Sequence, residues 1–249
     1  MEESKNSGNK LTWILIAINV IVFELVFSLP EATRELVFEM FSFSFGNMFQ
    51  IWRWFSSLFL HVDANHLFFN MLGLYFFGKV LEEDLDRKWW IAIYFAAGLL
   101  GNFAFMFTSM SPVIGASGCM FGLMGAAMFL KPLKKIHLYI FPLPLGIIAI
   151  ILAIFESLMT AMGSVGQVAN IAHVAGLITG AIFAFFHSPK QAAKGIMFLV
   201  ILMVLLMLLI PFFLLITTIG GVILGVVESI VGFFLYGIAN IISFLWTLF

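Results

Sequence analysis

Charged residues are few and clustered in this chain, and the stretches between the clusters are long enough to cross a lipid bilayer. Only 10% of the 249 residues are Asp, Glu, Lys or Arg, whereas a water-soluble domain has about 25%. A membrane-spanning helix needs about 20 mostly apolar residues. The sequence therefore predicts an all-α polytopic membrane protein. Its apolar runs are Leu11–Leu29, His66–Leu81, Trp89–Phe107, Ser117–Leu130, Ile136–Met162, Gln167–His187, Ile196–Thr218 and Gly221–Leu248.

Composition also limits the classes of function. The net charge of −1 gives no reason to expect nucleic acid as a partner, whereas membrane lipid is an obligatory one. The single cysteine, Cys119, excludes an internal disulfide and a cysteine-based metal cage. The first apolar run contains Asn19 and Glu24 and lacks a small-residue cleavage site, so we do not expect it to be a signal peptide.

The distribution of Lys and Arg predicts the orientation. Cytoplasmic loops of membrane proteins carry an excess of these residues. With the amino terminus inside, only Arg34 and Arg53 fall outside. We therefore expect a cytosolic amino terminus. The residues on the inner side are Lys5, Lys10, Lys79, Arg87, Lys88, Lys131, Lys134, Lys135, Lys190 and Lys194.

The one long connection, residues 30–65, lies outside in this orientation. Near its start, apolar and charged residues alternate with the period of an amphipathic helix lying in the membrane interface. The apolar members are Leu36, Val37, Met40 and Phe41, and the charged ones are Glu31, Arg34, Glu35 and Glu39.

Polar side chains gather at the outer ends of three runs. His66 and Asn70 begin the second run, Ser117 begins the fourth, and His173 lies near the outer end of the sixth. Polar groups inside a membrane are costly and therefore mark candidate functional sites. The predicted topology brings all four to a similar depth on one side of the membrane. The second and fourth runs are short for a full span, which leaves room for a water-filled cavity at that end.

Each of these residues also has a purely structural interpretation. Ser117 can cap the N-terminus of its helix, although the positive end of the helix dipole there also favours an anion. His66 and Asn70 are four residues apart and share one helix face, so they can bridge helices or together donate to an oxyanion. His173 can form an interhelical hydrogen bond.

Small residues at every fourth position favour the functional interpretation. Two helices with such stripes pack closely in lipid, and Ser117 and His173 each adjoin the first residue of a stripe. If the stripes face each other, the hydroxyl and the imidazole meet, as a nucleophile and its general base must. The stripes are Gly118, Gly122 and Ala126 in the fourth run, and Ala172, Gly176 and Gly180 in the sixth.

The combination of these motifs, in this order, resembles the signature of the rhomboid family of intramembrane serine proteases. The resemblance covers residues 11–187 and implies a six-helix core, preceded by a short cytosolic segment at residues 1–10. Residues 188–249 are then one or two extra transmembrane helices. The matching residues are Trp52, Arg53, His61, His66, Asn70, Gly78, Glu82, Gly115, Ala116, Ser117, Gly118, Ala172, His173, Gly176 and Gly180.

The resemblance implies a Ser117–His173 dyad without a cofactor or metal. His66, Asn70 and the backbone N–H of Ser117 then form the oxyanion hole. By the same resemblance, Trp52, Arg53 and His61 support the outer loop, and Glu82 lies at the inner end of its helix. Where the family often has a tyrosine, four residues after the serine, this chain has Phe121, which can pack on His173 but not hydrogen-bond to it.

A dyad opening to the extracytoplasmic side implies single-span membrane proteins as substrates, cut near small or helix-breaking residues at the outer end of their helices. The resemblance makes Ile136–Met162 a lateral gate. Two alternatives stay open, a catalytically inactive relative that binds transmembrane clients and a small transporter. A zinc protease is disfavoured because His61 and His66 are five residues apart and no H-E-x-x-H motif occurs. The oligomeric state and the roles of Glu156 and Glu228 are left open.

Overall fold

The structure is a computed structural model that describes residues 10–138, 141–152 and 169–246. It divides into two compact units, residues 1–199 and 200–249, which are described separately.

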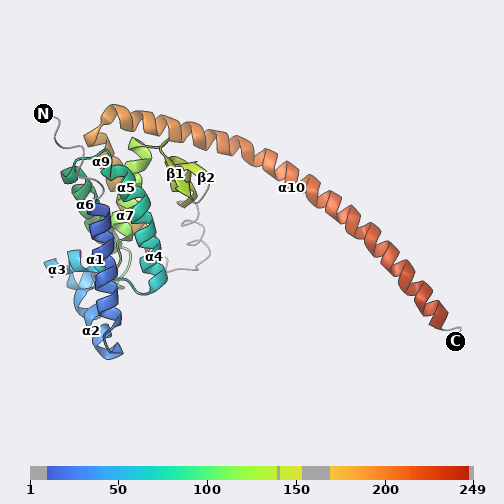
Figure 1. Cartoon of the computed structure of the whole chain (residues 1–249), viewed down its shortest axis with the longest axis horizontal. Helices are drawn as coiled ribbons and strands as arrows, with labels where there is room; N and C mark the ends of the chain where they lie inside the picture. Colours follow the sequence, from blue (N-terminus) through green and yellow to red (C-terminus); the bar gives the residue numbers. More distant parts are fainter. Residues whose placement is uncertain (1–9, 139–140, 153–168, 247–249) are drawn as a thin grey trace. The chain divides into compact units, whose positions relative to one another are not determined.

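The first unit is a bundle of helices (Figure 1). Three of its helices, α6, α7 and α9, pack on one another, and α4, η3 and α5 add further buried residues to the core. Between α4 and α5 the chain continues helically through a π-helical stretch, η3. The described helices of the bundle outside the outer loop include α1 (Lys10–Phe27), α4 (Ala64–Gly73), η3 (Leu74–Gly78), α5 (Lys79–Glu82), α6 (Arg87–Phe105), α7 (Ser117–Leu130) and α9 (Ala169–His187).

Lys10–Phe27 and Asn170–His187 are long and apolar enough to span a membrane, and α7 is a shorter apolar helix. The outer loop between α1 and α4 contains short helices in which most apolar residues are exposed, although Leu58 is buried. They are α2 (Glu31–Phe41), η1 (Phe45–Asn47), α3 (Ile51–Ser56) and η2 (Ser57–Phe59). The amphipathic helix predicted in this loop corresponds to α2.

Glycines bring α7 and α9 into backbone contact, as the two small-residue stripes predict. A Cβ atom added to Gly176 would overlap the carbonyl oxygen of Gly118, and one added to Gly180 would overlap that of Gly122. On the other side of α7, Gly122 leaves space for the Cβ of Ala97 in α6. Only glycine permits such an approach, so these positions fix how the three helices pack.

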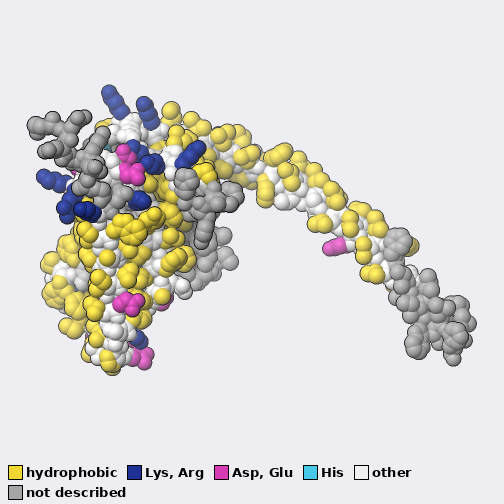
Figure 2. Space-filling model, in the orientation of Figure 1, with side chains coloured by type: hydrophobic (Ala, Val, Ile, Leu, Met, Phe, Trp, Pro, Cys, Tyr) yellow, Lys and Arg dark blue, Asp and Glu magenta, His cyan; other side chains and the backbone are white. Residues whose placement is uncertain are grey.

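Charged side chains hold the helix ends at one end of the first unit, where most Lys and Arg residues gather (Figure 2). Glu82 accepts hydrogen bonds from the backbone N–H and the hydroxyl of Thr12, at 3.3 and 2.8 Å, and so caps the N-terminus of α1. Lys131 pairs with Asp84 at 2.8 Å.

The predicted helix Ile136–Met162 does not begin where the hydropathy places it. Residues Lys135–Leu138 and Phe141–Pro144 form the antiparallel strands β1 and β2, and the helix begins only at residue 145. Pro142 and Pro144 account for the difference, because proline lacks an N–H and disfavours helical backbone at the residue before it. Residues 139–140 and 153–162 of the predicted gate, including Glu156, lie outside the described residues.

The last helix, α10 (Pro189–Trp246), is continuous through residues 219–220, which separate the two apolar runs of the sequence. Pro211 lies inside it, and the Thr217 and Thr218 hydroxyls bond to the Leu214 carbonyl at 2.9 and 2.8 Å, within the helix. Among the described residues, no atom lies within 4 Å of a Cβ atom added to Gly220 or Gly221. The helix persists there although glycine has a low helix propensity.

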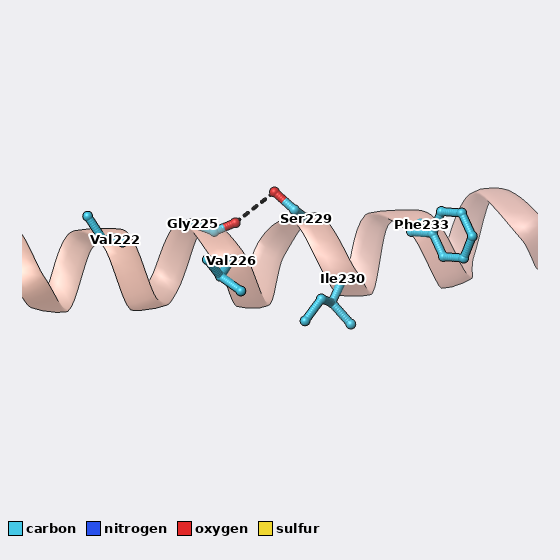
Figure 3. Close-up of a pocket in the computed structure, with 6 residues that line it drawn as sticks. All are labelled: Val222, Gly225, Val226, Ser229, Ile230 and Phe233. Carbon is cyan, nitrogen blue, oxygen red and sulfur yellow. Dashed lines mark hydrogen bonds between the residues drawn. The ribbon is translucent and has the colours of Figure 1, made fainter.

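The part of α10 in the second unit has a shallow hollow on one side (Figure 3). Its lining comes from this helix alone and is mostly apolar, and its one hydroxyl, that of Ser229, bonds to the Gly225 carbonyl at 2.8 Å. Such a surface has no group that could perform chemistry. The lining residues are Val222, Gly225, Val226, Ser229, Ile230 and Phe233.

Candidate active site

Ser117 and His173 meet in the first unit, although 56 residues separate them in the chain. The Ser117 Oγ lies 2.8 Å from the His173 Nε2. Ser117 is the first residue of α7, and His173 lies near the start of α9. The glycine-lined contact between these helices sets the distance, so the predicted juxtaposition of hydroxyl and imidazole is confirmed. Both residues are half-buried.

The turn that leads into Ser117 requires a glycine. Gly115 has a φ of 117°, which L side chains rarely adopt. A Cβ atom there would also lie 2.8 Å from the His66 ring. The Gly115 N–H donates to the carbonyl of Ser57 at 2.8 Å, which ties this turn to the outer loop.

Phe121 lies one helical turn beyond Ser117 and stacks on His173. The ring centroids are 4.4 Å apart and the planes are 8° from parallel. This contact confirms that the phenyl ring can pack on the imidazole. It restrains the plane of the His173 ring, and therefore the direction in which Nε2 points.

His66 and Asn70 flank the same turn from α4. The Asp63 side chain caps this helix by accepting from the His66 N–H at 2.8 Å. The Asn70 Nδ2 donates to the His66 carbonyl at 2.8 Å and lies 3.8 Å from a Cβ atom added to Gly115. The His66 and Asn70 side chains therefore lie together beside Gly115, two residues before Ser117.

His61 packs against the His66 ring and so supports this arrangement. It is buried and its ring lies edge-on to that of His66, with centroids 5.1 Å apart. Burial, and then the charge of His66, lower the pKa of His61 to about 3, so it stays neutral at ordinary pH.

The other predicted site residues lie elsewhere. The Trp52 Nε1 donates to the Met40 carbonyl at 3.4 Å, and the Arg53 guanidinium donates to the Glu39 and Ser42 carbonyls. Both fasten the outer loop.

Gly118, Gly176 and Gly180 shape the helix contact that carries the dyad. Glu82 matches the family signature but lies far from the dyad, at the inner end of its helix as the resemblance implies, where it caps the N-terminus of α1. The 16 residues that separate it from His66 along a continuous helix correspond to about 24 Å.

Sequence reasoning missed Ser57. It is fully buried, its carbonyl accepts from Gly115, and its hydroxyl accepts from the Asn102 Nδ2 at 3.0 Å. Asn102 in turn reaches the Trp54 carbonyl at 3.4 Å. The only sequence signal was Asn102, an amide within an otherwise apolar run.

The fold and this geometry agree with the comparison to known families, in which the rhomboid domain matches residues 48–190. That match covers more than half of the chain and includes all the residues of the candidate site. The chain belongs to the rhomboid family. A rhomboid domain implies a polytopic helical membrane protein.

Several rhomboid proteins are similar to the chain. It is 28% identical to the rhomboid protease GlpG of Salmonella paratyphi A over 73% of this chain and 64% of that protein. It is 32% identical to the mitochondrial rhomboid protein 1 of Saccharomyces cerevisiae over 57% of this chain and 42% of that protein. It is 29% identical to the rhomboid protease GluP of Bacillus subtilis over 50% of this chain and 25% of that protein. The chain thus spans less than two thirds of the length of each of these rhomboid relatives.

Proposed function

We propose that the protein is an intramembrane serine endopeptidase in which Ser117 is the nucleophile and His173 the general base. The observation that carries this proposal is the 2.8 Å separation of Ser117 Oγ and His173 Nε2. A serine hydroxyl becomes a useful nucleophile only when a base within hydrogen-bond reach takes its proton. The similar proteins named rhomboid proteases support the same activity.

In this mechanism the Ser117 Oγ attacks the carbonyl carbon of the scissile bond while His173 Nε2 takes the hydroxyl proton. The tetrahedral intermediate collapses when the imidazolium gives that proton to the leaving amine. Water then hydrolyses the acyl-enzyme, again with His173 as base. The stacked Phe121 ring holds the imidazole in plane through both steps.

The negative oxygen of the intermediate needs donors close to Ser117. The Ser117 N–H lies at the N-terminus of α7, where backbone N–H groups have no partner within the helix. His66 and the second N–H of the Asn70 amide add side-chain donors beside Gly115. Loss of one such donor typically costs about 3 kcal/mol of transition-state stabilisation.

The substrates in this proposal are membrane proteins with a single transmembrane helix. The dyad lies at the end of the bundle opposite the lysine-rich end, so it would face the extracytoplasmic side in the predicted orientation. A helical peptide bond is shielded by its own hydrogen bonds, so cleavage requires local unwinding, which small or helix-breaking residues favour.

Labelling of the purified full-length protein with a fluorophosphonate probe tests the proposal. The wild type is expected to be labelled, and Ser117→Ala is expected not to be. Ser229→Ala, which removes a serine hydroxyl in α10, is the matched control and should be labelled like the wild type. Persistent labelling of Ser117→Ala would contradict the nucleophile assignment. An unlabelled wild type that also fails to cleave a transmembrane substrate would favour an inactive relative.

A further inference from the structure

A second hollow lies at the lysine-rich end of the first unit, away from Ser117 and His173. It has a volume of about 420 Å³, which falls in the range of small-molecule sites. One wall comes from the C-terminus of α7 and the turn after it, and the other from the first turns of α10. The lining residues are Leu130, Lys131, Pro132, Leu133, Lys134, Gln191, Lys194, Gly195 and Phe198.

Hydrogen bonds and close packing against backbone carbonyls hold the two walls together. The Gln191 Nε2 donates to the Leu130 carbonyl at 2.8 Å. Gly195 packs so closely that a Cβ atom there would overlap the Phe129 carbonyl. The Pro132 carbonyl accepts from the Gly146 N–H at 2.9 Å, which joins the start of the next helix to the same turn. The two walls of the hollow are therefore fixed relative to each other by direct contacts.

The charge of this hollow suits one negative group. Lys131 pairs with Asp84 at 2.8 Å and Lys134 with Glu83 at 2.7 Å. Lys194 lines the same hollow, and within the described part of the chain it makes no ion pair. Each paired ammonium keeps further N–H donors, since Lys has three. Three lysines and two carboxylates leave one positive charge.

The apolar part of the lining indicates what carries the negative charge. Leu130, Leu133 and Phe198 stand beside the lysines, and Leu133 is 62% exposed. The hollow lies where apolar helices end, at the level where headgroups meet hydrocarbon in a bilayer. A ligand with a charged head and a hydrocarbon tail would satisfy both parts of this surface, whereas a free anion would use only the lysines.

We infer that this hollow, the lysine pocket, binds the phosphodiester headgroup of an anionic membrane phospholipid. The charge of −1 on a phosphodiester matches the excess charge of the pocket. Basic pockets between membrane helices on the cytoplasmic side are suited to such headgroups. The inference concerns binding at a place remote from the dyad, and it stands whether or not the protein is a protease.

Lipid binding by the purified full-length protein tests the inference. In neutral detergent, the protein is titrated with phosphatidylglycerol or with zwitterionic phosphatidylcholine, and bound lipid is counted by native mass spectrometry. We expect the wild type to retain one phosphatidylglycerol molecule and to prefer it over phosphatidylcholine. One lysine near an anionic headgroup contributes about a fivefold change in affinity, so Lys194→Gln should weaken binding by about that factor.

Lys190→Gln is the matched control, because Lys190 is an exposed lysine in the same helix that does not line the pocket. It should bind phosphatidylglycerol like the wild type, and Lys194→Arg should keep most of the binding. Circular dichroism and thermal unfolding check that each variant is folded.

Equal losses in Lys190→Gln and Lys194→Gln would overturn the inference, because they would indicate diffuse surface charge. Equal binding of both lipids would also overturn it. Displacement of phosphatidylglycerol by millimolar inorganic phosphate would show that the pocket takes free anions and would refute the lipid assignment.

Discussion

The same spacing of glycines has opposite surroundings in the two units of this protein. In α9, Gly176 and Gly180 are four residues apart, and each lies against a backbone carbonyl of α7. In α10, Gly221 and Gly225 have the same spacing, yet no described atom lies within 4 Å of a Cβ atom added to either. A small-residue stripe thus permits close helix contact without determining whether a partner occupies it.

The comparison extends to serine. Ser117 stands at a helix start beside an imidazole, whereas Ser229 lies inside α10 and bonds to the carbonyl four residues before it. The chemistry of a hydroxyl in a membrane helix therefore depends on what a second helix brings to it. The predictions below test that dependence.

Removal of the imidazole should have the largest effect. His173→Ala leaves the Ser117 hydroxyl without its base, so we expect cleavage of a transmembrane substrate to fall by a factor of about 1,000 or more. The measurement is kcat/KM for a single-span substrate in liposomes. Ser229→Ala is the control and should be unchanged. Undiminished cleavage by His173→Ala would remove the base role.

The glycine comparison predicts a large difference in stability. In Gly180→Leu the new side chain meets the Gly122 carbonyl and the Ala126 N–H, so the helices must separate. We expect a loss of about 3 kcal/mol or more in the free energy of unfolding. Gly225→Leu is the matched control and should change it by less than about 0.5 kcal/mol. Thermal unfolding in detergent measures both, and similar losses in the two variants would mean that α10 has a partner at this stripe.

This contrast also explains which features of the structure could be predicted from the sequence. Hydropathy predicted α7 with its observed bounds, because a loop with Pro112 and Gly115 precedes it and Lys131 and Pro132 follow it. The stripes predicted the contact between α7 and α9, and with it the proximity of Ser117 and His173.

The features that could not be predicted from the sequence depend on contacts or local constraints that hydropathy does not describe. The hairpin at Lys135–Pro144 replaced the first turns of a predicted helix because two prolines outweighed hydropathy. The role of Ser57 depends on the Gly115 N–H and the Asn102 amide, both more than 40 residues away. No local pattern in the Trp52–Phe59 segment indicates these contacts.

Acid should destabilise the first unit through His61. The unfolded chain binds a proton at this residue below about pH 6.5, whereas the folded protein binds it only near pH 3. Stability is therefore lost as the pH falls between these values, by at most about 1.4 kcal/mol per pH unit.

His61→Gln, which does not titrate there, should show a shallower loss when unfolding is measured from pH 7 to pH 4. Ser229→Ala, which removes no titratable group, provides the control and should retain the wild-type slope. An unchanged slope in His61→Gln would show that His61 is not the group responsible.

The smallest expected effect concerns the ring that stacks on the base. An aromatic stack of this kind is worth about 1 kcal/mol, so Phe121→Ala should lower kcat about fivefold while the substrate KM changes little. Phe121→Tyr keeps the stack and should stay within about twofold of the wild type. Phe233, an exposed phenylalanine in α10, is the matched position, and Phe233→Ala should leave kcat unchanged. If Phe121→Ala cleaved as fast as the wild type, the contact between α7 and α9 alone would be sufficient to orient His173.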